Sequence, residues 1–139
     1  MASLVGSRVE RKEDKRFLTG KGRYTADINI ANQTYAVFVR SPHARAKIKK
    51  VDCSKSMKAP GVIEIFTGDS IAKDKIGGLI AGWKIVSEDG TDMKVPAHPP
   101  LANDQANYVG DHVAVVIAET LDEAKEAAEL VKVDYKIFK

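Results

Sequence analysis

The sequence has little of what disulfide-bonded, exported or membrane-spanning proteins need. Its 139 residues include a single cysteine, Cys53, so no intrachain disulfide can form. The N-terminal residues turn charged after residue 7 and lack the apolar core of a signal peptide. No apolar run approaches the roughly 18 residues that cross a bilayer. These absences predict a cytoplasmic chain in a reducing setting, without a membrane partner.

The chain also lacks a strong excess of one charge. Lysine and arginine number 22 and aspartate and glutamate 19, and both signs are interspersed along the sequence. The densest basic run is AKIKK at 46–50, whose alternation predicts a strand with one solvent-facing side. Nucleic-acid-binding domains usually gather their basic residues into one stripe, so we do not expect a nucleic-acid partner.

What is present is the composition of one globular domain, with 44% hydrophobic and 29% charged residues. Residues 1–15 are polar and charged and follow neither a helical nor a strand period, which predicts an extended N-terminal arm. Residues 16–139 are expected to form a single domain.

Apolar periodicity predicts the elements of this domain. The continuous apolar run HVAVVIA at 112–118 is typical of a central strand. A capping box from Thr120 to Glu123 then predicts a helix, and VKVDYKIF at 131–138 alternates like a closing strand. A largely buried strand is expected at 33–41, and further strands at 46–52 and 62–68. A helical turn is expected at 54–59 and a loop from 69 to 107. The pattern predicts an α+β fold with a mixed sheet, two helices and a strand–helix–strand unit at the C-terminal end.

The stretch TGKGRY at 19–24 is open to two interpretations. Its glycines would let backbone N–H groups approach a phosphate closely. However, the residues around Gly20 and Gly22 match neither the P-loop nor the dinucleotide-binding pattern. A tight turn with a positive φ at one or both glycines is the simpler interpretation.

No residue is marked as catalytic or metal-binding by its neighbours in the sequence. His43, His98 and His112 are scattered, without partners at the spacing of zinc ligands. Ser41 and His43 are close together, but a catalytic triad also needs an orienting acid and an oxyanion hole.

Cys53 and Trp83 are the other residues with possible chemical roles. Cys53 follows Asp52 and has no nearby histidine, which indicates a half-buried structural thiol. Trp83 lies near glycines and fits equally well an interface anchor or a plug over the core.

Four segments, in order, resemble one known family. They are RKEDKRFLTGKGRYTADI (11–28), AVFVRSPHARAKIKKVD (36–52), APGVIEIFTGDS (59–70) and PPLANDQANYVGDHVAVVIAETLDEAKEAAELVKVDYK (99–136). Together they are similar to the N-terminal a/b hammerhead domain of the molybdopterin-binding large subunit of molybdenum hydroxylases. This family includes carbon monoxide dehydrogenases, aldehyde oxidases and xanthine dehydrogenases, and the opening motif is most like the carbon monoxide dehydrogenase branch. Departures from the family pattern are Arg45 for a histidine, Asp111 for a glutamate and His112 for a proline.

The resemblance implies a structural and assembly domain rather than a catalytic one. In the family, later domains hold the molybdopterin cofactor, and partner subunits carry iron–sulphur clusters and FAD. It therefore implies no catalytic, cofactor-binding or metal-binding residue in this chain. The implied partners are the remaining cofactor-binding domains of the large subunit and the iron–sulphur and flavin subunits. The motif residues expected at such interfaces are Arg16, Phe17, Gly20, Gly22, Tyr24, Arg40, His43 and Gly110.

Two other functions remain open from the sequence. One is a stand-alone binding module with the same fold and no redox role, whose glycine turn would then hold an anionic ligand. The other is a small basic nucleic-acid binder, which a steep salt dependence of affinity would reveal.

Overall fold

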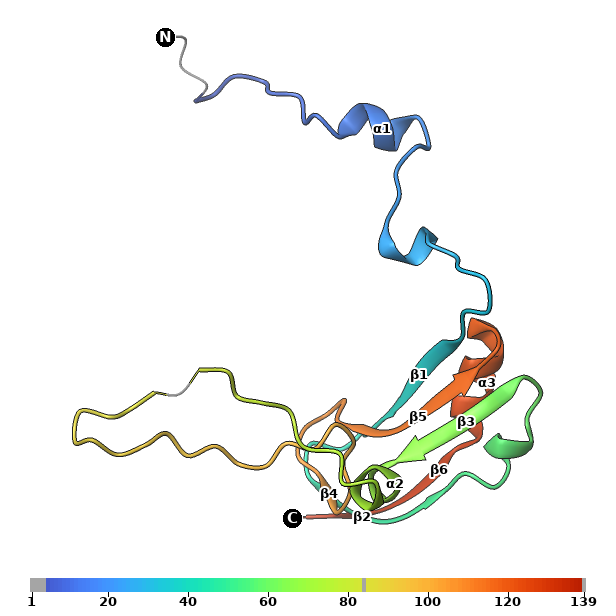
Figure 1. Cartoon of the computed structure of the whole chain (residues 1–139), viewed down its shortest axis with the longest axis vertical. Helices are drawn as coiled ribbons and strands as arrows, with labels where there is room; N and C mark the ends of the chain where they lie inside the picture. Colours follow the sequence, from blue (N-terminus) through green and yellow to red (C-terminus); the bar gives the residue numbers. More distant parts are fainter. Residues whose placement is uncertain (1–4, 84, 139) are drawn as a thin grey trace. The chain divides into compact units, whose positions relative to one another are not determined.

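The computed structural model describes residues 5–83 and 85–138. The chain divides into two compact units, Met1–Gln33 and Thr34–Lys139 (Figure 1). The domain boundary at residue 16 stays a prediction. Within the described part of the chain, every helix is too short or too polar to cross a bilayer.

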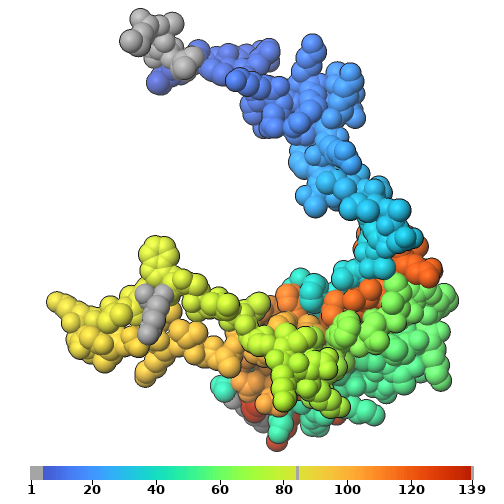
Figure 2. Space-filling view, in the orientation of Figure 1, coloured from blue at the N-terminus to red at the C-terminus, as the bar shows by residue number. Residues whose placement is uncertain are grey.

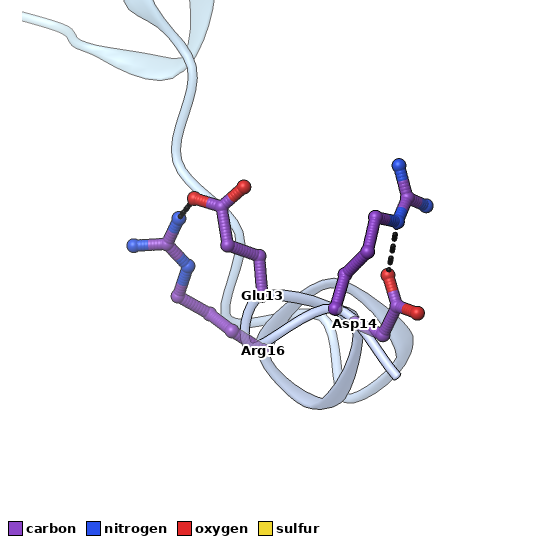
Figure 3. A network of polar contacts seen from close by, with 4 residues as sticks. Glu13, Asp14 and Arg16 are labelled. Atoms are coloured by element: carbon purple, nitrogen blue, oxygen red, sulfur yellow. Dashed lines mark hydrogen bonds and ion pairs between the residues drawn. The ribbon is translucent and has the colours of Figure 1, made fainter. Parts of the chain in front are cut away.

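The first unit contains a short helix, α1 (Asp14–Leu18), and a 3-10 turn at Thr25–Asp27. Helix α1 begins inside the stretch that we expected to be extended. Two solvent-exposed ion pairs between residues three apart span this turn: Arg11 lies 3.0 Å from Asp14, and Arg16 lies 3.0 Å from Glu13 (Figure 3). Apolar periodicity did not reveal the helix because none of its residues is buried.

The first sheet of the second unit is built around β5 (His112–Ala118), and its central position confirms the prediction from the sequence. Strands β1 (Tyr35–Arg40) and β3 (Val62–Thr67) pair with β5 on either side, both antiparallel. Val113 and Val116 of β5 are fully buried. Strand β1 is less buried than its apolar sequence suggested, because as an edge strand it alternates between half-buried and exposed residues.

The second sheet has β2 (Ala46–Asp52) at its centre, between β4 (Gln105–Ala106) and β6 (Lys132–Ile137). The α+β class is confirmed, but the strands of the described residues form two antiparallel three-stranded sheets rather than one mixed sheet. The reason is the course of the chain after α3 (Leu121–Leu130). Strand β6 pairs with β2 in the second sheet instead of returning parallel to β5 in the first.

Helix α3 begins at the predicted capping box. The Thr120 N–H donates to the Glu123 carboxylate at 3.1 Å, and the Glu123 N–H donates to the Thr120 hydroxyl at 3.2 Å. Ala127 of this helix is fully buried and belongs to one core cluster with Ile65 and Val116. The helix therefore covers the first sheet with its small apolar face.

Two further helical turns lie beside the sheets. Helix α2 (Gly68–Lys73) falls in the region expected to be a loop, and its first turn is capped by Thr67, which accepts a hydrogen bond from the Ser70 N–H at 3.4 Å. The turn expected at 54–59 is a 3-10 turn at Ser56–Lys58. Its buried Ser56 hydroxyl donates to the Ala127 carbonyl at 2.6 Å, which ties the turn to α3.

Residues 76–100 connect α2 to the region of β4. A single β-bridge, Val86 with Asp92, joins the two arms of this segment within the described residues. Figure 1 shows these arms as two lengths of chain running side by side, and Figure 2 shows them in yellow with few neighbouring atoms. The loop expected here is therefore a long hairpin without a sheet of its own.

Candidate functional site

The expected interface residues fall into two clusters, one in each unit. We name Arg16, Phe17, Gly20, Gly22 and Tyr24 the arm cluster. The second, the strand-end cluster, comprises Arg40, Ser41, His43, Gly110 and Asp111. Sequence reasoning had selected every member except Ser41 and Asp111, and the role of both clusters at an interface stays a prediction.

The arm cluster is built on two stacked rings. Phe17 and Tyr24 lie with ring centroids 5.4 Å apart and planes 8° from parallel. The Arg16 guanidinium lies 5.1 Å from the Phe17 centroid, a cation–π geometry. Gly22 is required beneath this stack, because a Cβ there would collide with the Phe17 ring. The four residues thus form one small platform, on which Tyr24 is 65% exposed.

Gly20 ends helix α1 and has a φ of +68°. Its N–H donates to the Phe17 carbonyl at 3.1 Å, and the Lys21 N–H donates to the Arg16 carbonyl at 2.9 Å. This pair of bonds is a Schellman motif, which closes the C-terminal end of a helix. Since both amides are already engaged, and since a helix C-terminus disfavours anions, the geometry supports the tight turn rather than a phosphate cradle.

The strand-end cluster joins the end of β1 to the start of β5. The Arg40 guanidinium donates to the Gly110 carbonyl at 3.1 Å. The Ser41 N–H donates to the Asp111 carbonyl, and the Gly110 N–H donates to the Ser41 carbonyl, each at 2.8 Å. Ser41 and Asp111 are both buried, so the two backbone bonds that involve them are shielded from water, whereas the Arg40 bond is exposed.

The hydroxyl of Ser41 is not activated as a nucleophile. It accepts a hydrogen bond from the His43 N–H and donates to the His43 carbonyl, both at 3.1 Å, so its partner is backbone rather than imidazole. The His43 ring packs edge-on against Tyr135, with centroids 5.0 Å apart. The arrangement therefore lacks the hydroxyl-to-imidazole contact on which a triad depends.

Asp111 is buried and Tyr135 is half-buried, and sequence reasoning did not expect either residue at a site. The Asp111 carboxylate accepts a hydrogen bond from the Asn107 N–H at 2.9 Å, which fixes the loop before β5. Burial is the main cause that raises the pKa of the Tyr135 hydroxyl; the neighbouring Ser41 hydroxyl lowers this pKa, and the Asp111 charge raises it. Within the described residues the Tyr135 hydroxyl has no hydrogen-bond partner. Only the position of Tyr135 on the inward side of the alternation in 131–138 indicated that it would be partly buried.

The histidines serve as packing groups. His112 stacks on Phe38 with centroids 4.4 Å apart, and His98 packs edge-on against Tyr108 at 6.4 Å. The part of the chain that the structure describes holds no group of three or more His, Cys, Asp or Glu side chains placed to bind a metal. Burial, followed by the charge of Asp52, raises the pKa of the Cys53 thiol, which disfavours the reactive thiolate.

A cavity of about 600 Å³ lies between the base of the long hairpin and the loop before β5. Its walls are mainly apolar, with Ile80 and Pro96 on one side and Tyr108 and Asp111 on the other. Among the described residues that line it, Asp111 is the only aspartate, glutamate, lysine or arginine, and a carboxylate repels the phosphates of an anionic dinucleotide cofactor. The cavity therefore does not fit a molybdopterin dinucleotide. One cysteine in the whole sequence likewise cannot supply the thiolates of an iron–sulphur cluster.

Comparison with known proteins decides the family. The family model described as "Aldehyde oxidase and xanthine dehydrogenase, a/b hammerhead domain" matches residues 19–139. This chain belongs to that family. The resemblance inferred from four sequence segments is thereby confirmed.

Individual relatives agree with this assignment. The chain is 39% identical over 129 residues to the nicotine 6-hydroxylase large subunit of Paenarthrobacter nicotinovorans, covering 93% of the chain and 15% of the relative. It is 33% identical over 134 residues to the carbon monoxide dehydrogenase large chain of Afipia carboxidovorans, covering 95% and 15%. The crystal structure of quinoline 2-oxidoreductase from Pseudomonas putida 86 matches with a TM-score of 0.81 at 34% identity, over 96% of this chain and 16% of that one. The hammerhead chain thus spans about 15% of the length of these curated relatives.

Proposed function

We propose that this hammerhead chain is a structural and assembly domain of the large subunit of a molybdenum hydroxylase, without turnover of its own. The observation that carries the proposal is the match of nearly the whole chain to about 15% of each relative. The proposal is supported by the single cysteine and by the cavity, among whose described lining residues Asp111 is the only aspartate, glutamate, lysine or arginine.

In the complete enzyme, molybdopterin, iron–sulphur clusters and FAD would be held by the remaining domains and partner subunits. The molybdenum centre would oxidise carbon monoxide, an aldehyde or an N-heterocycle. Water would supply the oxygen, and electrons would pass to the iron–sulphur and flavin centres. We propose a cytoplasmic enzyme with no nucleic-acid or membrane partner.

The arm from Arg8 to Arg16 and the adjoining arm cluster would lie against such a partner. The ion pairs of α1 are exposed and add little stability by themselves, so they leave charges available for contact. The platform of Phe17 and Tyr24 offers an aromatic surface beside these charges. Charged and aromatic side chains in one place are typical of the anchors of protein interfaces.

Native purification of this protein from its source tests the proposal. An affinity-tagged chain is recovered at low salt, its molybdenum and iron are measured by elemental analysis, and co-purified chains are identified by mass spectrometry. We expect a larger molybdenum-bearing chain with iron–sulphur and flavin partners in stoichiometric amounts. Recovery of the 139-residue chain alone, without metal, would contradict the proposal.

The alternative, a stand-alone binding module, is favoured by one observation. The cavity of about 600 Å³ is within the size range of small-molecule sites and lies wholly inside the second unit. Under this alternative the chain would be recovered with a small organic ligand and without larger partners. Native mass spectrometry of the purified chain distinguishes the two.

A further inference from the structure

The long hairpin exposes an unusual number of large apolar side chains. We name residues 79–83 and 85–95 the docking hairpin. Ile80 is 92% exposed and Trp83 is 80% exposed, which decides against Trp83 as a plug over the core. The other large apolar side chains exposed along it are Leu79, Ile85, Val86 and Val95. Several large apolar side chains exposed close together along one segment indicate an interaction surface.

The tip of the docking hairpin is held in shape by its own hydrogen bonds. The Met93 N–H donates to the Ile85 carbonyl at 2.9 Å, and the Ser87 N–H donates to the Thr91 carbonyl at 2.8 Å. The Asp89 carboxylate accepts from the Thr91 N–H at 2.9 Å and from its hydroxyl at 2.6 Å. A two-stranded hairpin is marginal in water without a surface to pack on. The tip is thus preorganised, while its apolar side chains lack a covering layer.

The tip also carries a defined charge. Glu88 and Asp89 lie within the turn, and Asp92 lies beside it at the β-bridge to Val86. The hydrogen bonds from Thr91 lower the pKa of Asp89, which keeps its carboxylate ionised. The surface is therefore mainly apolar along the arms, which also carry the exposed Lys94, and acidic at the end. A complementary partner presents an apolar groove that ends in basic residues.

We propose that the docking hairpin inserts into such a groove on the remaining domains of the same large subunit. This rests on the proposed function, since those domains make up about 85% of each relative and are joined to the hammerhead domain there. Permanent interfaces are more apolar than transient ones, which suits a neighbour that is always present. Covalent linkage also raises the effective concentration of the groove, so the hairpin is covered as soon as the subunit folds.

The test uses the full 139-residue chain and, as a separate polypeptide, the remaining large-subunit domains from the same source. Their dissociation constant is measured by titration calorimetry. We expect Trp83→Ala and Ile80→Ser each to weaken binding by about tenfold or more. Ile63→Ser is the matched control, because Ile63 is 50% exposed on β3, outside the hairpin, and should change binding by less than about twofold. These side chains contact solvent, so the circular dichroism and Tm of the variants should equal those of the unaltered chain.

Each of four other outcomes would overturn the inference, and each can be told apart from the rest. Equal dissociation constants for all variants would show that the hairpin lies outside the interface, and would not count against the proposed function. Failure of the unaltered chain to bind counts against the proposed function itself, and the inference falls with it. Self-association that disappears in Trp83→Ala identifies a second copy of this chain as the occupant. Shielding of Trp83 from acrylamide quenching in the isolated chain shows that the chain covers its own hairpin.

Discussion

The Arg40 guanidinium donates a hydrogen bond to the carbonyl of Gly110, 3.1 Å away and 70 residues further along the chain. The register of β1 against β5 shifts between Val39 and Arg40, at the point where this contact begins. The segments VRSPHA and YVGDHV, which we recognised separately in the sequence, are therefore one structural unit. Gly110 has a φ of +91°, a conformation that side chains with a Cβ rarely adopt.

We expect Gly110→Ala to lower the free energy of unfolding by about 1–2 kcal/mol, because alanine is strained at this positive φ. Denaturant unfolding followed by circular dichroism measures the effect. Gly77→Ala is the control, since Gly77 has an ordinary φ and no atom within 4 Å of a Cβ. Equal stability of the two variants would contradict the strain argument.

Phe17→Ala should reduce recovery of the molybdenum-bearing chain in the native purification severalfold. The substitution removes the ring between Arg16 and Tyr24 and so dismantles the platform that we place against a partner. Leu18→Ala is the control on the same helix, because Leu18 is 86% exposed and outside the ring stack. If both variants recover the partner as well as the unaltered chain does, the arm cluster is not part of the interface.

The thiol of Cys53 should react slowly with iodoacetamide at pH 8. Burial and the Asp52 charge raise its pKa, and a raised pKa leaves less thiolate at a given pH. Asp52→Asn keeps the oxygen that caps Ser54 but removes the charge, so the midpoint of the pH–rate profile should shift downward. Glu64→Gln, which also removes one negative charge but is not among the causes of the Cys53 shift, should leave the midpoint unchanged. A pH–rate midpoint for Cys53 at or below that of a free thiol would contradict the raised pKa.

Patterns within one short stretch of sequence were enough to predict the elements that such a stretch marks by itself. The apolar run of β5, the capping box of α3 and the alternation of β6 are all visible in the sequence. Helix α2 was missed because its cap pairs Thr67 with Ser70 rather than with a glutamate or glutamine. The exposed helix α1 left no apolar signal at all.

These local sequence patterns could not predict which strands pair with one another or which distant residues come into contact. Nothing in the alternation of β6 says whether it pairs with β2 or returns to β5, because either neighbour would bury the same face. The bond from Arg40 to Gly110 likewise depends on the approach of two distant segments. The exposure of Trp83 required the structure, since an isolated tryptophan in a loop suits both the core and the surface.

Gly68 offers a test of how closely α2 approaches the loop before β4. A Cβ at this buried position would collide with the Ala102 carbonyl oxygen and lie 2.7 Å from the Asn103 Cα. These are backbone atoms, so they cannot move aside as a side chain can. Alanine is favoured over glycine within helices by about 1 kcal/mol, which would stabilise the variant if there were room.

We expect the steric clash to outweigh the gain in helix propensity. Gly68→Ala should therefore lower the free energy of unfolding by about 1–3 kcal/mol, as overpacking of a well-packed site does. Denaturant unfolding measures the change. Ser70→Ala is an unsuitable control because it removes the cap, whereas Ala72→Gly in the same helix reports helix propensity alone and should destabilise by at most about 1 kcal/mol. A Gly68→Ala variant as stable as the unaltered chain, or more so, would mean that α2 lies further from Ala102 than the structure places it.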